Sequence, residues 1–294
     1  MDYLLLDEAL GMSFVMITEV SEGGSVPDLK VANGSNKPVL IVEGEEMVGA
    51  KQNRIANVTI LVGPMQTIVI PVSCVEQGRW HYEQENFRTE GRMFMSRGRA
   101  RNVHDVMESK RISGEYRADQ GAVWDDVECC MDAAGAHSPT GAMSEVYVSR
   151  HDRLQEYLQA FNCLDRQAGV LVSIDGRVAG LDLFATPATC RSLFPKLVSS
   201  YALDALETMR PNRRHRRPVK AAATFWNGLN GAVYEATPSI SLGEDIRFEA
   251  DTLVGAALTL NQTPLHLCAF PRTSPRSSHD HHPMRRPSQR RERF

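Results

Sequence analysis

The sequence predicts an α+β fold, with antiparallel β-sheets and helices packed on them, in a single large domain over residues 1–270. Three patterns predict it. Residues 13–72 read as short strands with tight turns, residues 102–161 carry apolar side chains at helical spacing, and strand character returns after residue 169. Hydrophobic residues make up 42% of the chain and charged residues 23%, the balance of a folded soluble protein. The 294 residues suit one large domain or two fused lobes.

The N-terminal part is predicted to form a short helix at residues 4–10 and then a series of strands. Pro38 stands at the start of one of them, where proline is tolerated. Short connections between the strands favour antiparallel pairing. The expected strands are residues 13–20, 37–42, 47–50, 58–62 and 67–72.

The second half is predicted to alternate helices with a further set of strands. Thr140, after Ser138, is expected to cap a helix. Strands are expected on both sides of Asp175-Gly176, a dipeptide typical of tight hairpins, and again up to residue 270. The expected helices are residues 102–111, 121–134, 146–161, about 189–208 and 221–229; the hairpin strands are residues 169–174 and 177–184.

Two segments are rich in arginine. Residues 209–220 are predicted to form a basic loop, and residues 271–294 a disordered tail with seven arginines and four prolines. The net charge is −3, so the body before the tail is acidic. Both segments could touch a polyanion, but they lack interleaved aromatic residues, so nucleic acid is not the expected partner.

The sequence also gives expectations about the location of the protein in the cell and about metal binding. The uncharged stretch at residues 55–75 is broken by Pro64 and Pro71, which argues against a membrane span. Asp2 lies where a secretory signal has basic residues, so a cytoplasmic protein is expected. The six cysteines form no C-x-x-C pair, and we expect reduced, mostly buried thiols and no metal site.

An internal similarity links residues 39–49 with residues 170–180. Each reads as an apolar strand, an acidic-glycine turn, a short strand and a glycine. Two such hairpins could form equivalent halves of one sheet and direct polar groups into a shared cleft. Alternatively, any two hairpins resemble each other over eleven residues.

The first candidate site segment is residues 49–54, which places four polar side chains after a glycine. Lys51, Gln52, Asn53 and Arg54 offer cationic and amide donors suited to phosphate or ribose oxygens. The alternative is an exposed strand edge kept soluble by charge.

The second candidate segment is residues 71–80. Strand alternation places Cys74 and Glu76 on one face and Gln77 on the other. Near a cationic side chain, Cys74 could be a nucleophile and Glu76 a general base. The alternative makes Cys74 a small core residue and Glu76–Arg79 a structural ion pair.

Further candidates lie later in the chain. Asp182, flanked by two leucines in an apolar strand, must be solvated or paired. His266 fits a hydrogen-bonded core histidine. A helix face and a cap could also approach the cleft, although Trp124 fits the core and Thr140 a simple cap. This last group consists of Gln120, Trp124, Asp125, Ser138 and Thr140.

Residues 43–54 and 71–80 resemble the ARG and Rhodanese-Phosphatase-superfamily-associated protein domain family. Gln120 with residues 123–125, and residues 180–184, continue the match, which covers most of residues 10–270. The resemblance implies an α+β enzyme that acts with ADP-ribosylglycohydrolase-type proteins on ADP-ribose or NAD derivatives. The residues that match its motifs are Gln52, Asn53, Arg54, Cys74, Glu76, Gln77, Arg79 and Asp182.

The leading hypothesis is an enzyme acting on a phosphorylated nucleotide-like ligand related to ADP-ribose or NAD. The alternative is a non-catalytic ligand-binding or scaffold module in an ADP-ribose-linked pathway. Both require the two segments to line a common cleft, and catalysis by Asp182 requires this strand to join them. The expected catalytic residues are Glu76, Asp182 and Cys74; the expected ligand-binding residues are Lys51, Gln52, Asn53, Arg54, Gln77 and Arg79.

Overall fold

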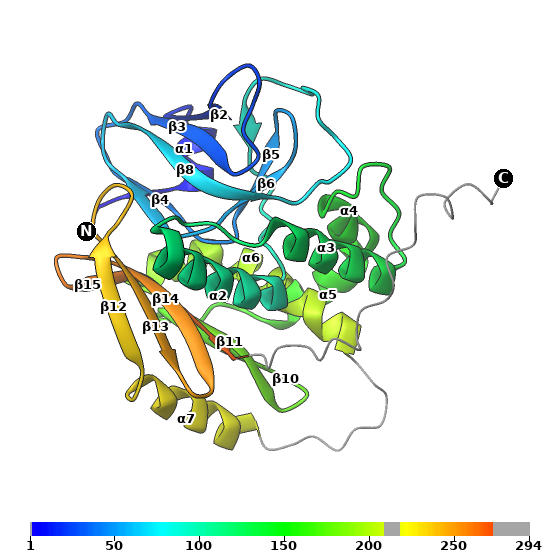
Figure 1. Ribbon diagram of the computed structural model, residues 1–294. Helices are drawn as coiled ribbons and strands as arrows, with labels where there is room; N and C mark the ends of the chain where they lie inside the picture. The colour runs from blue at the N-terminus through cyan, green and yellow to red at the C-terminus, as the bar shows by residue number, and fades with distance from the viewer. Residues whose placement is uncertain (1, 209–217, 273–294) are drawn as a thin grey trace.

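The computed structural model describes residues 2–208 and 218–272 and confirms the predicted α+β class. Figure 1 shows the N-terminal strands at the top and the C-terminal strands at the bottom, with α2 and α6 at the level between them. The strands form two six-stranded sheets and one three-stranded sheet in the described part of the chain. Their pairing is antiparallel except between β1 and β4.

The N-terminal six-stranded sheet has the order β2-β3-β8-β6-β5-β9. In β2, Val15, Ile17 and Glu19 are buried while Met16 is exposed, so one face of the strand is directed into a core. That face is apolar until it reaches Glu19. The strands are β2 (Val15–Glu19), β3 (Asp28–Asn33), β5 (Glu46–Gly49), β6 (Arg54–Ala56), β8 (Thr67–Cys74) and β9 (Phe87–Arg88).

A small sheet of order β1-β4-β7 joins the N-terminal part to the rest of the molecule. It consists of β1 (Leu4–Leu5), β4 (Val39–Ile41) and β7 (Ile60–Val62), and α1 (Leu6–Gly11) follows β1 directly. Leu40 and Leu61 of this sheet share a buried cluster with Leu193 of α6 and with Leu258 and Leu265 of the C-terminal sheet. This shared core ties the two large sheets together.

The second six-stranded sheet has the order β10-β11-β15-β14-β13-β12. Its first two strands are joined at Asp175 and Gly176, which both have positive φ, as the predicted tight turn requires. One face packs on α2 through Phe270, and the other packs on α7 through Phe225. The strands are β10 (Gly169–Ile174), β11 (Arg177–Phe184), β12 (Val233–Pro238), β13 (Glu244–Ala250), β14 (Leu253–Leu260) and β15 (Thr263–Pro271).

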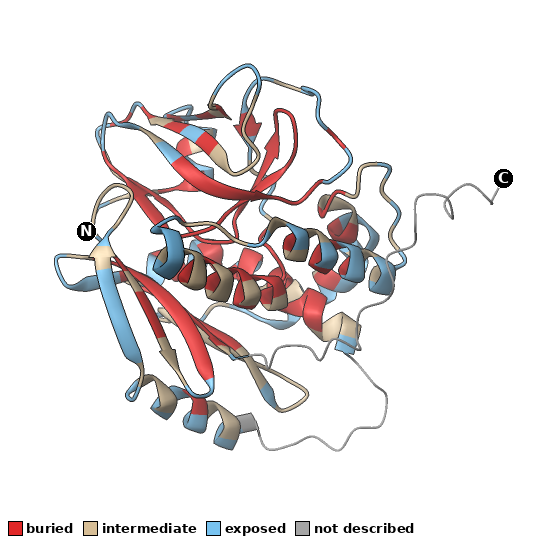
Figure 2. Cartoon of the chain, viewed as in Figure 1, coloured by how far each residue is buried: buried red, intermediate tan, exposed pale blue. Residues whose placement is uncertain are grey.

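The helices cover both sheets and bury one side each, as Figure 2 shows for α2 and α3. Asp119 caps α3 by accepting hydrogen bonds from the backbone N–H groups of Gly121 and Ala122. The remaining helices are α2 (Ser96–Ser113), α3 (Gln120–Ala134), α4 (Ser144–Ser149), α5 (His151–Ala160), α6 (Pro187–Thr208) and α7 (Pro218–Leu229). No helix in the described ranges is long and apolar enough to span a membrane.

Several element predictions were wrong. The predicted helix at residues 146–161 breaks at Arg150 into α4 and α5. Thr140 caps no helix, because α4 begins at Ser144 after Met143. Residues 39–49 form no hairpin: β4 pairs with β1 and β7, whereas β5 pairs with β6 and β9. The two proposed equivalent hairpins are therefore not equivalent.

The two arginine-rich segments fall largely outside the described residues. Residues 209–217 and 273–294 are not described, so the loop and tail predictions are untested there. Residues 218–220 open α7 and belong to no loop. Pro271 ends β15, and Arg272 pairs with Glu249 at 3.3 Å, so the start of the predicted tail is ordered by the sheet.

Candidate functional site

Strands β6 and β8 bring the two candidate segments together. Their antiparallel register places Arg54 directly opposite Cys74, so both side chains project from the same face. Gln52 lies between them: its Oε1 accepts hydrogen bonds from Arg54 Nη1 at 3.2 Å and from Cys74 Sγ at 3.1 Å. The two motifs are one structural unit.

Glu76 and Arg79 form a buried ion pair that holds the chain around residues 49–53. Arg79 donates to Glu76 through Nε at 2.9 Å and Nη2 at 2.7 Å, and to the Ala50 carbonyl at 2.6 Å. Glu76 also accepts from the Asn53 backbone at 3.1 Å and from the Thr140 hydroxyl at 2.8 Å. The Glu76–Arg79 ion pair that the sequence analysis gave as an alternative is therefore present, and the Thr140 hydroxyl adds a hydrogen bond to its carboxylate.

Neither Glu76 nor Cys74 has the ionisation behaviour of a base or nucleophile activated at neutral pH. Burial opposes ionisation of Glu76, but hydrogen bonds from Arg79, Thr140 and Asn53 outweigh it and lower the pKa of the carboxyl group. Burial raises the pKa of the Cys74 thiol despite the neighbouring charge of Arg54. Glu76 is thus a paired carboxylate and Cys74 a neutral thiol.

Arg54 differs from Arg79 because its hydrogen bonding is incomplete. The side chain is 0% exposed, and Nη1 is occupied by Gln52 and by the Asn53 carbonyl. Nε and Nη2 have no hydrogen-bond partner. The nearest carboxylate is Glu19, whose Oε1 lies 4.0 Å from Nη2. Burial lowers the pKa of this guanidinium. Two buried cationic donors are therefore left open.

The Trp80 ring lies over Arg54, and a second cation, Lys51, lies next to both Trp80 and Tyr82. The Trp80 ring centroid lies 5.8 Å from Arg54 Cζ and 5.4 Å from Lys51 Nζ, and the Tyr82 ring lies 5.1 Å from Lys51 Nζ. Lys51 Nζ donates to the carbonyls of Glu22 at 2.6 Å and Gly23 at 2.8 Å. Trp80 and Tyr82 are each 45% exposed. We define Glu19, Lys51, Arg54, Trp80 and Tyr82 as the Arg54 site.

Two of the predicted ligand-binding residues, Gln77 and Asn53, make hydrogen bonds within the loop region. The Gln77 side chain is exposed, and the main-chain carbonyl of Gln77 accepts a 3.3 Å hydrogen bond from Gln52 Nε2. Asn53 Oδ1 accepts from Arg79 Nη2 at 3.2 Å and from the Gly49 backbone at 3.2 Å. Both contacts fix the loop between β5 and β6.

Asp182 lies in a different polar cluster, inside the C-terminal sheet. It is held by Arg99 of α2, at 2.5 Å and 3.2 Å, by Tyr201 at 2.8 Å and by His266 at 3.1 Å. Burial opposes its ionisation, but Arg99 and His266 keep its pKa well below the usual range. The other ring nitrogen of His266 bonds Thr59 at 2.8 Å, which confirms the prediction of a satisfied core histidine. Because β11 directs Asp182 toward α2, the carboxylate is paired there rather than beside Glu76.

The group predicted from residues 120–140 contacts the candidate segments through Gln120 as well as through Thr140, which hydrogen-bonds Glu76. Gln120 exchanges two 2.8 Å hydrogen bonds with the backbone of Cys74 and so fixes the start of α3 to β8. Trp124 is half-buried and Asp125 is exposed. Ser138 Oγ accepts from the backbone N–H of Thr140 at 3.3 Å and supports the loop around it.

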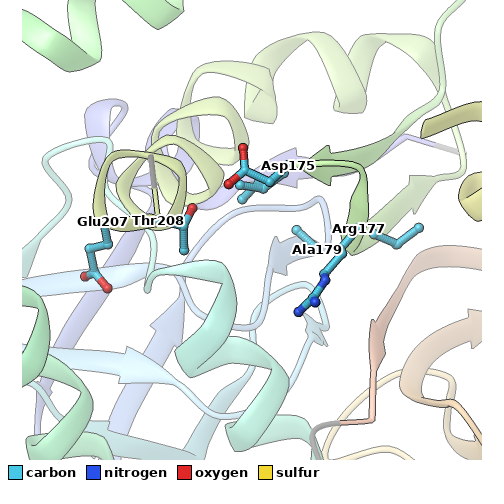
Figure 3. Close-up of a pocket in the computed structure, with 7 residues that line it drawn as sticks. Asp175, Arg177, Ala179, Glu207 and Thr208 are labelled. Carbon is cyan, nitrogen blue, oxygen red and sulfur yellow. The ribbon is translucent and has the colours of Figure 1, made fainter. Parts of the chain in front are cut away.

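A cavity of about 360 Å³ lies elsewhere, between the β10–β11 hairpin and the end of α6. Figure 3 shows Asp175 and Arg177 on the hairpin side, opposite Glu207 and Thr208. None of the predicted site residues lines it, and Thr208 is the last described residue before the gap. Within residues 2–208 and 218–272, no three His, Cys, Asp or Glu side chains are arranged to hold a metal ion.

Sequence reasoning missed two members of the Arg54 site, Glu19 and Tyr82. Glu19 continues the inward positions of Val15 and Ile17, so strand alternation would have identified a buried acid there. Tyr82 follows Trp80 by two residues in an irregular segment, for which periodicity gives no indication.

The fold and this geometry define an α+β protein whose N-terminal sheet carries a buried cationic site next to aromatic rings. Residues 1–270 match the model of the ARG and Rhodanese-Phosphatase-superfamily-associated Protein domain, ARPP-1, and the chain belongs to this family. The resemblance seen in the two motifs is confirmed. No curated protein and no solved structure matches the chain.

Proposed function

We propose that the protein binds a phosphorylated nucleotide derivative, ADP-ribose or NAD, at the Arg54 site. The observation that carries the proposal is the pair of unpartnered donors, Nε and Nη2, on a wholly buried guanidinium. These two nitrogens form one edge of the planar group, the edge that binds two oxygens of a phosphate at once. In a buried setting such a charge-assisted contact is stronger than in water.

The surrounding side chains suit the rest of such a ligand. Trp80 and Tyr82 present partly exposed ring faces on which a base can stack. Lys51 supplies a second positive charge next to both rings. Because Trp80 lies over Arg54, the indole must move when a phosphate reaches the guanidinium, so binding should change Trp80 fluorescence.

Turnover of the bound ligand is the second candidate function. It is favoured by the position of Cys74 directly opposite Arg54, which would place a thiol beside the ligand. Against it, Glu76 and Asp182 are fully engaged in ion pairs, and Cys74 is a neutral thiol. Ligand binding without turnover is therefore better supported than catalysis. An enzyme that uses Cys74 is the second candidate.

Calorimetry with ADP-ribose and NAD tests the binding proposal. Wild-type protein should bind at least one of them, and Arg54→Met should weaken this binding by about tenfold or more, the value of a charge-assisted hydrogen bond. Arg101→Met is the matched control, because Arg101 pairs with Asp126 on the helices α2 and α3. Melting curves must show that both variants fold. Absence of binding to both ligands by the wild-type protein would remove the proposal.

A separate assay decides between binding and turnover. The two ligands are incubated with wild-type protein and with Cys74→Ser, and the mixtures are separated by chromatography. A product formed by the wild type alone would identify an enzyme that uses Cys74. Unchanged ligands, together with binding by calorimetry, would establish a binding module.

A further inference from the structure

Glu19 is a second buried group of the Arg54 site with an open position. It is 5% exposed and ends the inward face of β2. Its Oε1 accepts a long hydrogen bond, 3.4 Å, from the Lys51 backbone. Its Oε2 has no hydrogen-bond partner. An ionised carboxylate can accept several hydrogen bonds, so this one is under-used.

Glu19 and Arg54 are neighbours, but they do not hydrogen-bond to each other. The closest approach between the charged groups is 4.0 Å, from Oε1 to Nη2, which is beyond hydrogen-bond distance. A closed bidentate pair, such as Arg79–Glu76, would satisfy both groups. Here one acceptor and two donors remain open side by side. Their complement is a molecule that offers oxygen acceptors to Arg54 and a hydroxyl donor to Glu19.

The surroundings of Gly24 show that the open oxygen of Glu19 lies close to the Lys51 and Trp80 side chains of the site. A Cβ at Gly24 would lie 3.4 Å from Glu19 Oε2, 3.1 Å from Lys51 Cδ and 3.3 Å from Trp80 Cζ2. Gly24 is therefore in close contact with all three side chains, which leave no room for a methyl group unless they shift. Its φ of +76° is a conformation that favours glycine.

From this arrangement we infer that Glu19 accepts a hydrogen bond from a ribose hydroxyl while Arg54 holds the phosphate attached to the same sugar. This inference rests on the proposed function and specifies the part of the ligand that contacts Glu19 and Arg54, a ribose 5-phosphate unit. The Glu19 carboxylate would repel a second phosphate attached to that hydroxyl. The ribose hydroxyl that contacts Glu19 must therefore be unphosphorylated.

Two phosphate monoesters separate this inference from the binding proposal itself. Ribose 5-phosphate and n-butyl phosphate carry the same charged group, but only the first has hydroxyls. Each competes with ADP-ribose in a calorimetric displacement experiment on wild-type protein. We expect ribose 5-phosphate to bind about tenfold tighter or better, the effect of one hydrogen bond to a carboxylate.

In the variant Glu19→Gln the affinities for ribose 5-phosphate and n-butyl phosphate should become nearly equal, chiefly because ribose 5-phosphate binds more weakly. Glu22→Gln is the matched control, since it makes the same charge change on an exposed neighbouring side chain, and it should keep the preference. Equal binding of the two phosphates by the wild type, or a preference that persists in Glu19→Gln, overturns the inference and leaves the binding proposal standing. If ADP-ribose, NAD and both phosphates fail to bind, both fall. The wild-type comparison decides the matter even if Glu19→Gln does not fold.

Discussion

Arg99 and Asp182 form a doubly hydrogen-bonded ion pair in the interior, with Nη2–Oδ1 at 2.5 Å and Nη1–Oδ2 at 3.2 Å. Neither residue is exposed. Arg99 also donates from Nε to Glu43, in the turn after β4, at 2.8 Å. Three distant parts of the chain therefore meet at one guanidinium, and Asp182 ties α2 to β11.

Replacing Asp182 with Asn should destabilise the protein without affecting the Arg54 site. Loss of one partner leaves the Arg99 charge less compensated in the interior, at a cost of roughly 3–5 kcal/mol in the free energy of unfolding. Urea unfolding measures this cost, with Asp175→Asn in the β10–β11 turn as control, because Asn tolerates that turn conformation. Unchanged stability together with lost ADP-ribose binding would return Asp182 to the ligand site.

Replacing Glu76 with Gln should lower stability in a pH-dependent manner. Its folded-state pKa is depressed, so its contribution is present above the unfolded pKa and disappears as pH falls through the folded value. The difference in unfolding free energy between wild type and Glu76→Gln should thus shrink in acid. A difference that stays constant from neutral pH to acid would contradict a structural role for the Glu76–Arg79 charge pair.

Glu46 should give the opposite pH dependence. It is wholly buried, and burial raises its pKa from 4.5 to about 7, although Arg92 lies 3.4 Å away. A raised folded pKa adds stability that is complete below the unfolded value and is lost as pH rises through 7. Between pH 4.5 and 8 the wild type should lose up to ~3 kcal/mol relative to Glu46→Gln. The exposed Glu83→Gln serves as control, and parallel stability curves for wild type and Glu46→Gln would refute the shift.

Replacing Gly24 with Ala should weaken ligand binding as well as strain the backbone. Gly114 has the same φ of +76°, but nothing lies within 4 Å of a Cβ placed there. Both substitutions should cost roughly 1–2 kcal/mol of stability from the left-handed conformation. Only Gly24→Ala adds a methyl group against Glu19, Lys51 and Trp80, so only it should reduce ADP-ribose affinity in calorimetry. An equal loss of affinity in Gly114→Ala would contradict the placement of the ligand beside Gly24.

Regular elements with strong local patterns could be predicted from the sequence. The hairpin strands β10 and β11 lie where Asp175-Gly176 and the flanking apolar runs place them. By contrast, β6 was missed because its three residues are too few to show alternation. The break at Arg150 was missed because apolar spacing continues from α4 into α5.

The composition of the site was predictable only in part. The sequence analysis assumed that the two motifs lie close together, and the pairing of β6 with β8 brings them together, although β6 was not predicted. The partner of Asp182 could not be predicted, because Arg99 lies 83 residues away and on a helix. The sequence also could not show which arginine would have unpaired donors. Arg54 and Arg79 look alike in sequence, and only the hydrogen bonds in the structure distinguish them.

A crystal structure of the protein with ADP-ribose tests the binding of phosphate by Arg54 most directly. We expect phosphate oxygens within hydrogen-bond distance of both Nε and Nη2, and the Trp80 indole moved from its place over the guanidinium. ADP-ribose bound at another surface, with Arg54 still covered by Trp80, would contradict the proposal.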